Sequence, residues 1–397
     1  MKIKSALTGA LLILLLFTGC SDDPSLLGVD FVKKDELKVI VLDALTDSMS
    51  QYSRSYREII ALGNADRLLL GNRQGIRSSI LLEFSLGFDE ATKALLADSK
   101  DSIEIISNKV ILTPNYKFGD TTGTFPVSSI KVNEIKTLWD PLTVRVDSLP
   151  DIDMTTSVLD GTPSADSNYH FSLNNALVMK WMKNTVDTNT YKNNGVFISV
   201  DVPTPYIAGF KGFSTDITVA PRIDIRFRKK GASTDTTITF RSISDAHVVE
   251  ASFTQTDPTL MTVQSGLTVG SSLYFDLKKL PKDIVINRAT LQINGASSEI
   301  GSSGFTSLLA RTITELNTDS TAKTYGVPSS TLSLSNNVYS GEVTSALENM
   351  FYLDKNLGFY LSTAAPAEGL EKIVLKGSSY PVYNERPRLV ITYTLVK

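Results

Sequence analysis

The single cysteine of the chain is the residue whose position points most clearly to chemistry. Cys20 closes the apolar run 11–20, and two of the first four residues are lysines. A basic start, a short apolar core and small residues before the thiol are typical of an export signal. The run is shorter than the roughly 20 residues that a spanning helix needs. We therefore expect residues 1–19 to be a lipoprotein signal peptide and Cys20 to be lipidated. A transmembrane anchor and a buried free thiol are the alternatives.

The residues that follow the cysteine bear on where the protein is delivered. Ser21 stands where an aspartate would favour retention at the inner membrane, and Asp22 and Asp23 come next. This acidic start resembles the short signal by which some gram-negative bacteria export lipoproteins to the cell surface. We expect residues 20–35 to be a lipidated linker and the protein to be held by lipid at the outer membrane, exposed on the cell surface. A plain solvated linker is the alternative.

Loop carboxylates are the candidate metal ligands. Asp120 lies in a Gly- and Thr-rich stretch, and Asp151 and Asp153 lie two residues apart. Carboxylate oxygens in a loop suit calcium, although the same residues also form turns when they bind no metal. The two histidines, His170 and His247, are too few for a zinc site when the only thiol carries lipid.

Aromatic residues are the candidate ligand-binding groups. Sugars stack their C–H faces on rings at a surface, and exposed rings on a loop suggest a partner. Three rings gather before one expected strand and two occupy the matching region of the second half: Tyr206, Phe210 and Phe213, then Tyr380 and Tyr383. The alternative is that these rings close the ends of the core.

Motifs for catalysis and for nucleic-acid binding are absent from the sequence. It contains no Gly-x-Ser-x-Gly elbow, phosphate loop, Gly-x-Gly-x-x-Gly or His-Glu-x-x-His. The formal net charge is −3, and the densest basic run, 226–230, has only five residues, which argues against a nucleic-acid partner. We expect a protein that is not an enzyme and has no cofactor, with calcium as the one candidate metal.

The elements that must position these residues are mostly β-strands. Short apolar or alternating runs such as 223–227 are separated by Gly, Asn, Asp, Ser and Thr, as in antiparallel sheets. Helical spacing is confined to 89–100, 173–182 and 343–351. The length exceeds what one ordinary core needs and indicates two domains.

An internal repeat divides the chain. Five short segments recur in the same order, and the two copies span 36–230 and 235–397, with insertions in the first at 87–102 and 142–168. We expect an all-β protein of two tandem antiparallel β-sandwiches, jelly-roll-like, with short helical insertions. Each copy closes with a Pro-Arg strand, in which alternate residues should face the core: Ile223 and Ile225, then Leu389 and Ile391.

The second copy resembles the DNRLRE-type β-sandwich domain. The matching segments are Phe-Asp-Leu-Lys-Lys-Leu-Pro at 275–281, Ala-Thr-Leu at 289–291 and Arg-Pro-Arg-Leu-Val-Ile-Thr-Tyr at 386–393. The first copy departs at Ser85, where that family has Asp. Some related domains are carbohydrate-binding modules, so the resemblance implies a glycan ligand. The start of the mature chain is also similar to an uncharacterised family of surface lipoproteins.

These observations lead to one expectation of function and two alternatives. We expect a non-catalytic, lipid-anchored cell-surface protein that binds an extracellular polymer, a glycan in preference to a surface protein. A structural or assembly lipoprotein of an outer-membrane or surface complex is the first alternative. A glycan-active hydrolase is the second, because two carboxylates from distant strands can meet in the fold.

Overall fold

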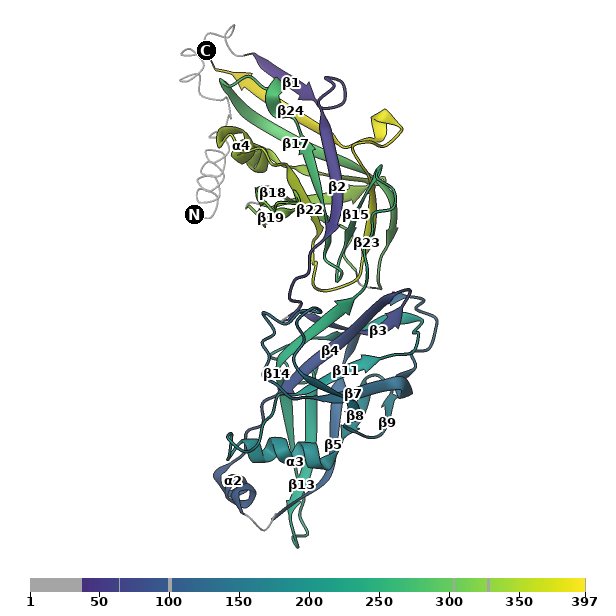
Figure 1. Ribbon diagram of the computed structural model, residues 1–397, viewed down its shortest axis with the longest axis vertical. Helices are drawn as coiled ribbons and strands as arrows, with labels where there is room; N and C mark the ends of the chain where they lie inside the picture. Colours follow the sequence, from purple (N-terminus) through teal and green to yellow (C-terminus); the bar gives the residue numbers. More distant parts are fainter. Residues whose placement is uncertain (1–37, 64, 99–101, 303, 327–328, 397) are drawn as a thin grey trace, which may run out of the picture.

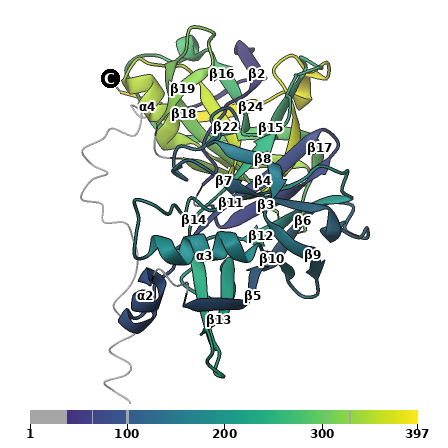
Figure 2. The same cartoon turned by 60° about the horizontal axis from the view of Figure 1, so that its bottom comes forward.

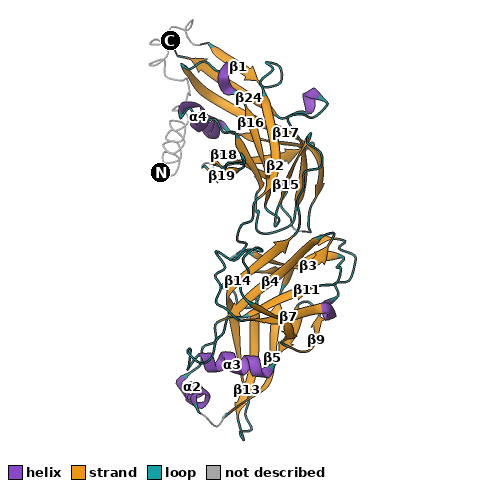
Figure 3. Cartoon of the chain, in the orientation of Figure 1, coloured by secondary structure: helices purple, strands orange, loops and turns teal. Residues whose placement is uncertain are grey.

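A computed structural model describes residues 38–63, 65–98, 102–302, 304–326 and 329–396, and over these the chain is predominantly β. Figures 1 and 3 show two β-domains joined end to end, with the few helices at their margins. The signal peptide, Cys20 and the linker 20–35 lie outside the described residues. The all-β prediction is therefore confirmed for the part that the structure describes.

The domain drawn at the top of Figure 1, which we call the second domain, contains twelve strands. Eight of them pair in a closed cycle, because the long strand β17 pairs with β21 over residues 290–294 and with β23 from Gly295 onward. The strands are β1 (Val39–Asp43), β2 (Gln51–Arg57), β15 (Leu260–Gln264), β16 (Val269–Phe275), β17 (Ile284–Glu299), β18 (Leu308–Leu316), β19 (Ala322–Tyr325), β20 (Ser330–Ser335), β21 (Val338–Glu342), β22 (Phe359–Thr363), β23 (Lys372–Lys376) and β24 (Arg388–Leu395).

The first domain also contains twelve strands, around a separate apolar core that includes Trp181, Phe84 and Phe210. The strands are β3 (Arg67–Arg73), β4 (Ile76–Phe84), β5 (Ile103–Leu112), β6 (Pro114–Gly119), β7 (Ile130–Ile135), β8 (Ile152–Ser157), β9 (Leu159–Ala165), β10 (Tyr169–Leu173), β11 (Val196–Val200), β12 (Tyr206–Lys211), β13 (Arg222–Lys229) and β14 (Thr236–Glu250).

The two domains share one pairing scheme. Strand β4 pairs with β11 as β16 pairs with β22, and β5 pairs with β13 as β17 pairs with β24. Strand β12 lies between β3 and β6, and β23 lies between β15 and the end of β17. Helices α3 (Asn175–Asn184) and α4 (Thr344–Tyr352) each precede the strand that pairs with β4 or β16. This one-to-one match is what a duplicated unit would produce.

The strand pairing does not follow the expected boundaries 36–230 and 235–397. Strands β1 and β2 belong to the first sequence copy, yet they pair with β24 and β16 of the second domain. Strand β14 belongs to the second copy, yet it pairs with β13 and β4 of the first domain. The opening strand of each sequence copy is thus exchanged into the other domain. Sequence could not show this, because an exchanged strand meets the same residue types in either domain.

The exchange makes the two domains physically continuous. Arg57, at the end of β2, donates hydrogen bonds to the carbonyls of Val249 in β14 and Leu267 in the second domain, at 3.0 and 3.1 Å. Tyr116 of β6 donates to Oε1 of the fully buried Glu371 at 2.8 Å and accepts from the Leu370 amide at 3.0 Å. A buried carboxylate is costly unless it is hydrogen-bonded, so this contact fixes the junction.

The closing strands have the predicted facing. Ile223, Ile225, Leu389 and Ile391 are fully buried, each two residues from its partner. Arg388 points out of the core and pairs with Asp43 of the exchanged strand β1, at 2.6 Å from Nη2 to Oδ2. Alternate burial is the direct result of the two-residue repeat of a strand.

The exchange predicts that the second domain cannot fold from the C-terminal part of the chain alone. Residues 258–397 lack β1 and β2, so β24 and β16 would each lose a hydrogen-bonded neighbour and the core would lose Ala44 and Met49. We expect this fragment to show little cooperative melting by circular dichroism, and a synthetic peptide of residues 38–57 to restore it. A peptide with Met49→Asp is the control. Equal melting with and without the peptide would contradict the prediction.

Candidate functional site

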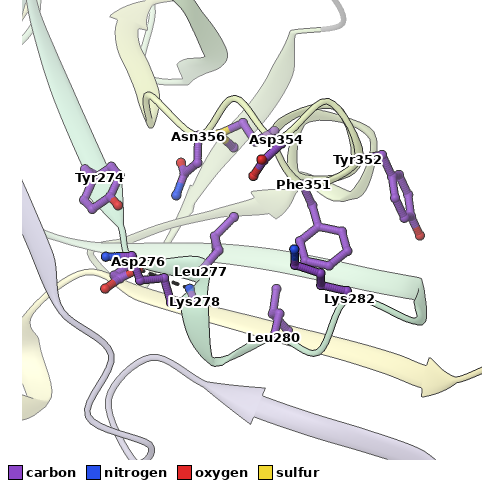
Figure 4. A pocket seen from close by; sticks show the side chains of 11 residues that line it. Tyr274, Asp276, Leu277, Lys278, Leu280, Lys282, Phe351, Tyr352, Asp354 and Asn356 are labelled. Atoms are coloured by element: carbon purple, nitrogen blue, oxygen red, sulfur yellow. Dashed lines mark hydrogen bonds between the residues drawn. The ribbon is translucent and has the colours of Figure 1, made fainter.

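A cleft of about 610 Å³ opens on the second domain. One wall is the segment that leaves β16, passes through the 3-10 turn η2 (Leu277–Lys279) and reaches Lys282. The other wall is the last turn of α4 and the chain up to Asn356. Figure 4 shows side chains from both walls around the space between them: Tyr274, Asp276, Leu277, Lys278, Leu280 and Lys282 on one side, and Phe351, Asp354 and Asn356 on the other. Met350 and Tyr352 also line the cleft.

The first domain has the same framework at the corresponding place. Asn356 donates to the Phe275 carbonyl at 2.7 Å, and Asn193 donates to the Phe84 carbonyl at 2.8 Å. Each asparagine is followed two residues later by a glycine with φ near +90° or +81°, where an added Cβ would collide with the carbonyl of Leu273 or Leu82. Only glycine fits such a close approach in a left-handed conformation.

The corresponding place in the first domain carries an insertion that the second domain lacks. Between β4 and β5 the chain forms α2 (Glu90–Ala97), which begins after the N-cap Asp89, contacts α3 (Figure 2) and buries Leu96. Phe88 packs edge-on against Phe227 and Phe240. The second domain has only the short turn η2 between β16 and β17. The cleft lies where the second domain lacks the segment that carries α2 in the first.

The cleft combines apolar surface with hydrogen-bonding groups. Leu277, Leu280 and Met350 are buried and form its floor, while Tyr352 is 52% exposed at the rim. The Tyr352 hydroxyl accepts from the Ile286 amide and donates to the Ile284 carbonyl, both at 3.3 Å, which fixes the ring.

Polar groups stand beside these rings. Asp276 caps η2 by accepting from the Lys278 amide at 3.1 Å. Burial and the negative charge of Asp276 raise the pKa of Tyr274. Carboxylate, amide, ammonium and hydroxyl groups beside exposed rings suit a ligand that has both hydroxyls and C–H faces.

The aromatic residues predicted from the sequence do not line this cleft. Tyr206 and Phe210 lie in the core of the first domain, against Phe125 and Tyr169, so the prediction that they bind a ligand is wrong. A ring buried among other rings cannot stack on a sugar.

The other three predicted rings reach the surface elsewhere. Phe213 and Tyr383 are each 43% exposed, and Tyr380 is half-buried. Each lies beneath a cation, Arg241 over Phe213, Arg386 over Tyr383 and Lys376 over Tyr380. Their role in binding stays a prediction.

The predicted calcium ligands act as turn formers. Asp120 accepts from the amide and hydroxyl of Thr122, and Asp153 accepts from Thr155 in the same way. The Asp151 amide bonds to the Thr137 hydroxyl. Within the described part of the chain, no three His, Cys, Asp or Glu side chains gather closely enough to hold a metal. Asp120, Asp151 and Asp153 therefore do not form a shared site.

The sequence alone does not identify the cleft residues as a site. It predicts the short helix over 343–351 and a family-like segment at 275–281, but nothing in it places the two on either side of one cleft. The missing insertion between β16 and β17 is the signal that could have found the site.

Two buried titratable groups on β14 lie outside the cleft. Burial raises the pKa of Asp245 to about 7, against the lowering effect of the Phe213 amide. Burial, followed by the charge of Arg67, lowers the pKa of His247 to about 3. The matching positions of β2, from the register on β4 and β16, are Ser53 and Ser55. These groups are structural polar residues in a packed strand.

Comparison with known proteins adds no family. No protein-family model, no curated protein and no solved structure matches the chain. Among the described helices, none is both long and apolar enough to cross a membrane.

Asp245 predicts a pH dependence of stability in the first domain. Its folded pKa exceeds the unfolded value of 3.8, so the stability it provides is complete below pH 4 and is lost as pH rises through 7. Asp245→Asn should remove that loss and be more stable than wild type at pH 8, by a few kcal/mol at most, roughly. Trp139 and Trp181 both lie in the first domain, so their emission in urea melts at pH 5 and pH 8 measures the difference. If the difference in unfolding free energy between Asp245→Asn and wild type were the same at pH 5 and pH 8, Asp245 would not titrate in this range.

Proposed function

We propose that this protein is a non-catalytic, lipid-anchored surface protein that binds an extracellular glycan in the cleft between η2 and α4. The observation that carries the proposal is the cleft itself, open in the second domain where α2 fills the first. We also propose that both domains are jelly-roll-like β-sandwiches. The shared pairing scheme and the separate core of each domain support this.

The chemistry of the cleft favours a glycan over an apolar ligand. Three rings line the cleft, those of Tyr274, Phe351 and Tyr352. Groups that bind hydroxyls stand beside them, on Asn356, Lys278, Asp276 and Asp354. Pockets for small molecules are usually lined mostly by apolar residues with few polar groups, whereas this cleft is lined by polar and apolar side chains in similar number. Asp276 and Asp354 both line it, so a glycan-active hydrolase is the second candidate.

The position of β1 in the chain determines which domain a lipid anchor would hold nearer the membrane. Seventeen residues separate Cys20 from Lys38, where the described chain begins, and such a linker spans at most about 60 Å. The chain then enters β1 of the second domain. The second domain, with its cleft, would lie nearer the membrane, and the first domain would stand farther out (Figure 1).

Removal of the cleft rings tests the binding proposal. The chain without its first 20 residues should bind selected sugars on an array of neutral, uronic-acid and sulfated oligosaccharides. Tyr352→Ala and Phe351→Ala should each weaken binding about tenfold, the effect expected of a central aromatic contact. Phe213→Ala is the comparison variant, since Phe213 is an exposed ring outside the cleft that the sequence also predicts to bind. Loss of binding in that variant instead would place the ligand at its loop.

Three outcomes separate the candidates. Loss of binding in Tyr352→Ala and Phe351→Ala but not in Phe213→Ala supports glycan binding in the cleft. No binding by the wild type sinks the proposal. New reducing ends released from a bound oligosaccharide would favour the hydrolase, and Asp276→Asn and Asp354→Asn would then be expected to abolish their release.

The lipid anchor is tested by Cys20→Ala. Cells fed with labelled palmitate should label the wild-type protein and not the variant, because the thiol is the acyl acceptor. The variant should also keep residues 1–19 and migrate as a larger precursor. Equal labelling of the two proteins would refute lipidation at Cys20.

A further inference from the structure

The exchanged strand of the second domain differs from its counterpart at one place. Strand β14 is continuous. It pairs with β13 up to Arg241 and with β4 from Ser242 onward. In the second domain β1 ends at Asp43 and β2 begins at Gln51. Residues 44–50, which we call the excursion, therefore leave the sheet where β14 has only a one-residue bulge, at Ile243.

The excursion is internally ordered. Asp43 accepts from the Leu45 amide at 3.0 Å, and Met49 donates to the Ala44 carbonyl at 2.9 Å. Ala44 and Met49 are buried in the core, while Ser48 is exposed with a left-handed φ of 49°. The Tyr383 hydroxyl donates to the Leu45 carbonyl at 2.6 Å. A segment tied at both ends and in the middle can act as a rigid support.

The excursion holds one wall of the cleft. The Asp276 amide donates to the Ser50 carbonyl at 2.8 Å. The Lys279 ammonium donates to the carbonyls of Asp47 and Ser48, the latter at 3.2 Å. Asp276 lines the cleft directly, whereas Lys279 does not. These bonds attach both ends of the Asp276–Lys279 turn to a segment that lies more than 200 residues earlier in the chain.

We propose that the excursion 44–50 is a positioning element of the cleft, which couples the N-terminal attachment of the chain to the shape of the binding site. The inference rests on the proposed function for its meaning, since it concerns the same cleft. Displacement of β1 and β2 would release the Ser50, Asp47 and Ser48 carbonyls from the turn, and Asp276 and Lys278 would then lose their places in the wall. Attachment of the chain on the N-terminal side of β1 would thereby control the affinity of the site.

Hydrogen exchange tests the positioning without a ligand. In the chain without its first 20 residues, Lys279→Met removes the ammonium, and Ser48→Val strains the left-handed residue of the excursion. Neither residue lines the cleft. Both variants should speed exchange of the amides of Asp276, Lys278 and Leu280 by about tenfold, by local opening. Peptides from β22 and β23 should exchange as in wild type.

Matched variants separate positioning from general stability. Ser48→Gly keeps the left-handed backbone without strain, and Lys109→Met removes an exposed lysine of the first domain; both should leave the exchange of the turn unchanged. Unchanged exchange in Lys279→Met and Ser48→Val would overturn the proposal, as would equal acceleration across the whole second domain. If the sugar array finds no ligand, the proposed function fails, but this experiment still decides whether the excursion positions the wall.

Discussion

The pairing of backbone groups between strands of the two sequence copies governs this structure. Buried backbone N–H and C=O groups must be paired, and each domain extends its ladders with a strand taken from the other sequence copy. Strands β1 and β2 complete the ladder on β24 and β16, and β14 completes the ladder on β13 and β4. The first domain is one continuous stretch, β3 to β14, whereas the second is completed by β1 and β2 from the other side of that stretch. The second domain therefore depends on strands that precede the first domain in the chain.

The junction between the domains has the features of an interior. Tyr116 reaches across to Glu371 and Leu370, and Arg67 lies 4.2 Å above the Tyr116 ring. Gly301 packs so closely on that ring that an added Cβ would lie 2.1 Å from it. Contacts between domains of one chain usually resemble transient interfaces. Here buried polar groups lie in the junction, and their hydrogen bonds fix how one domain sits on the other.

The cleft shows how duplicated units come to differ. The asparagine and glycine that shape its rear are present in both copies, at Asn193 and Gly195 and at Asn356 and Gly358. The first domain has the segment that carries α2 and covers its core with Phe88 and Leu96, and the second has a three-residue turn in its place. The second domain also has the excursion 44–50 beneath that turn. Both departures from the shared pattern lie at the same place, which is why the cleft is the candidate site.

Local patterns in the sequence determined the class of the fold and much of its detail. The alternation of apolar residues predicted the strands, and it placed Ile391 inside and Arg388 outside correctly, because the strand period of two depends only on neighbours along the chain. The repeat predicted two related domains, because recurring segments can be seen along the chain itself. Tertiary structure alone decided which domain receives β1, β2 and β14, since similar ladders offer similar partners. It also decided that Tyr206 is core and Tyr352 is surface, because the exposure of a ring depends on segments distant in sequence that cover it.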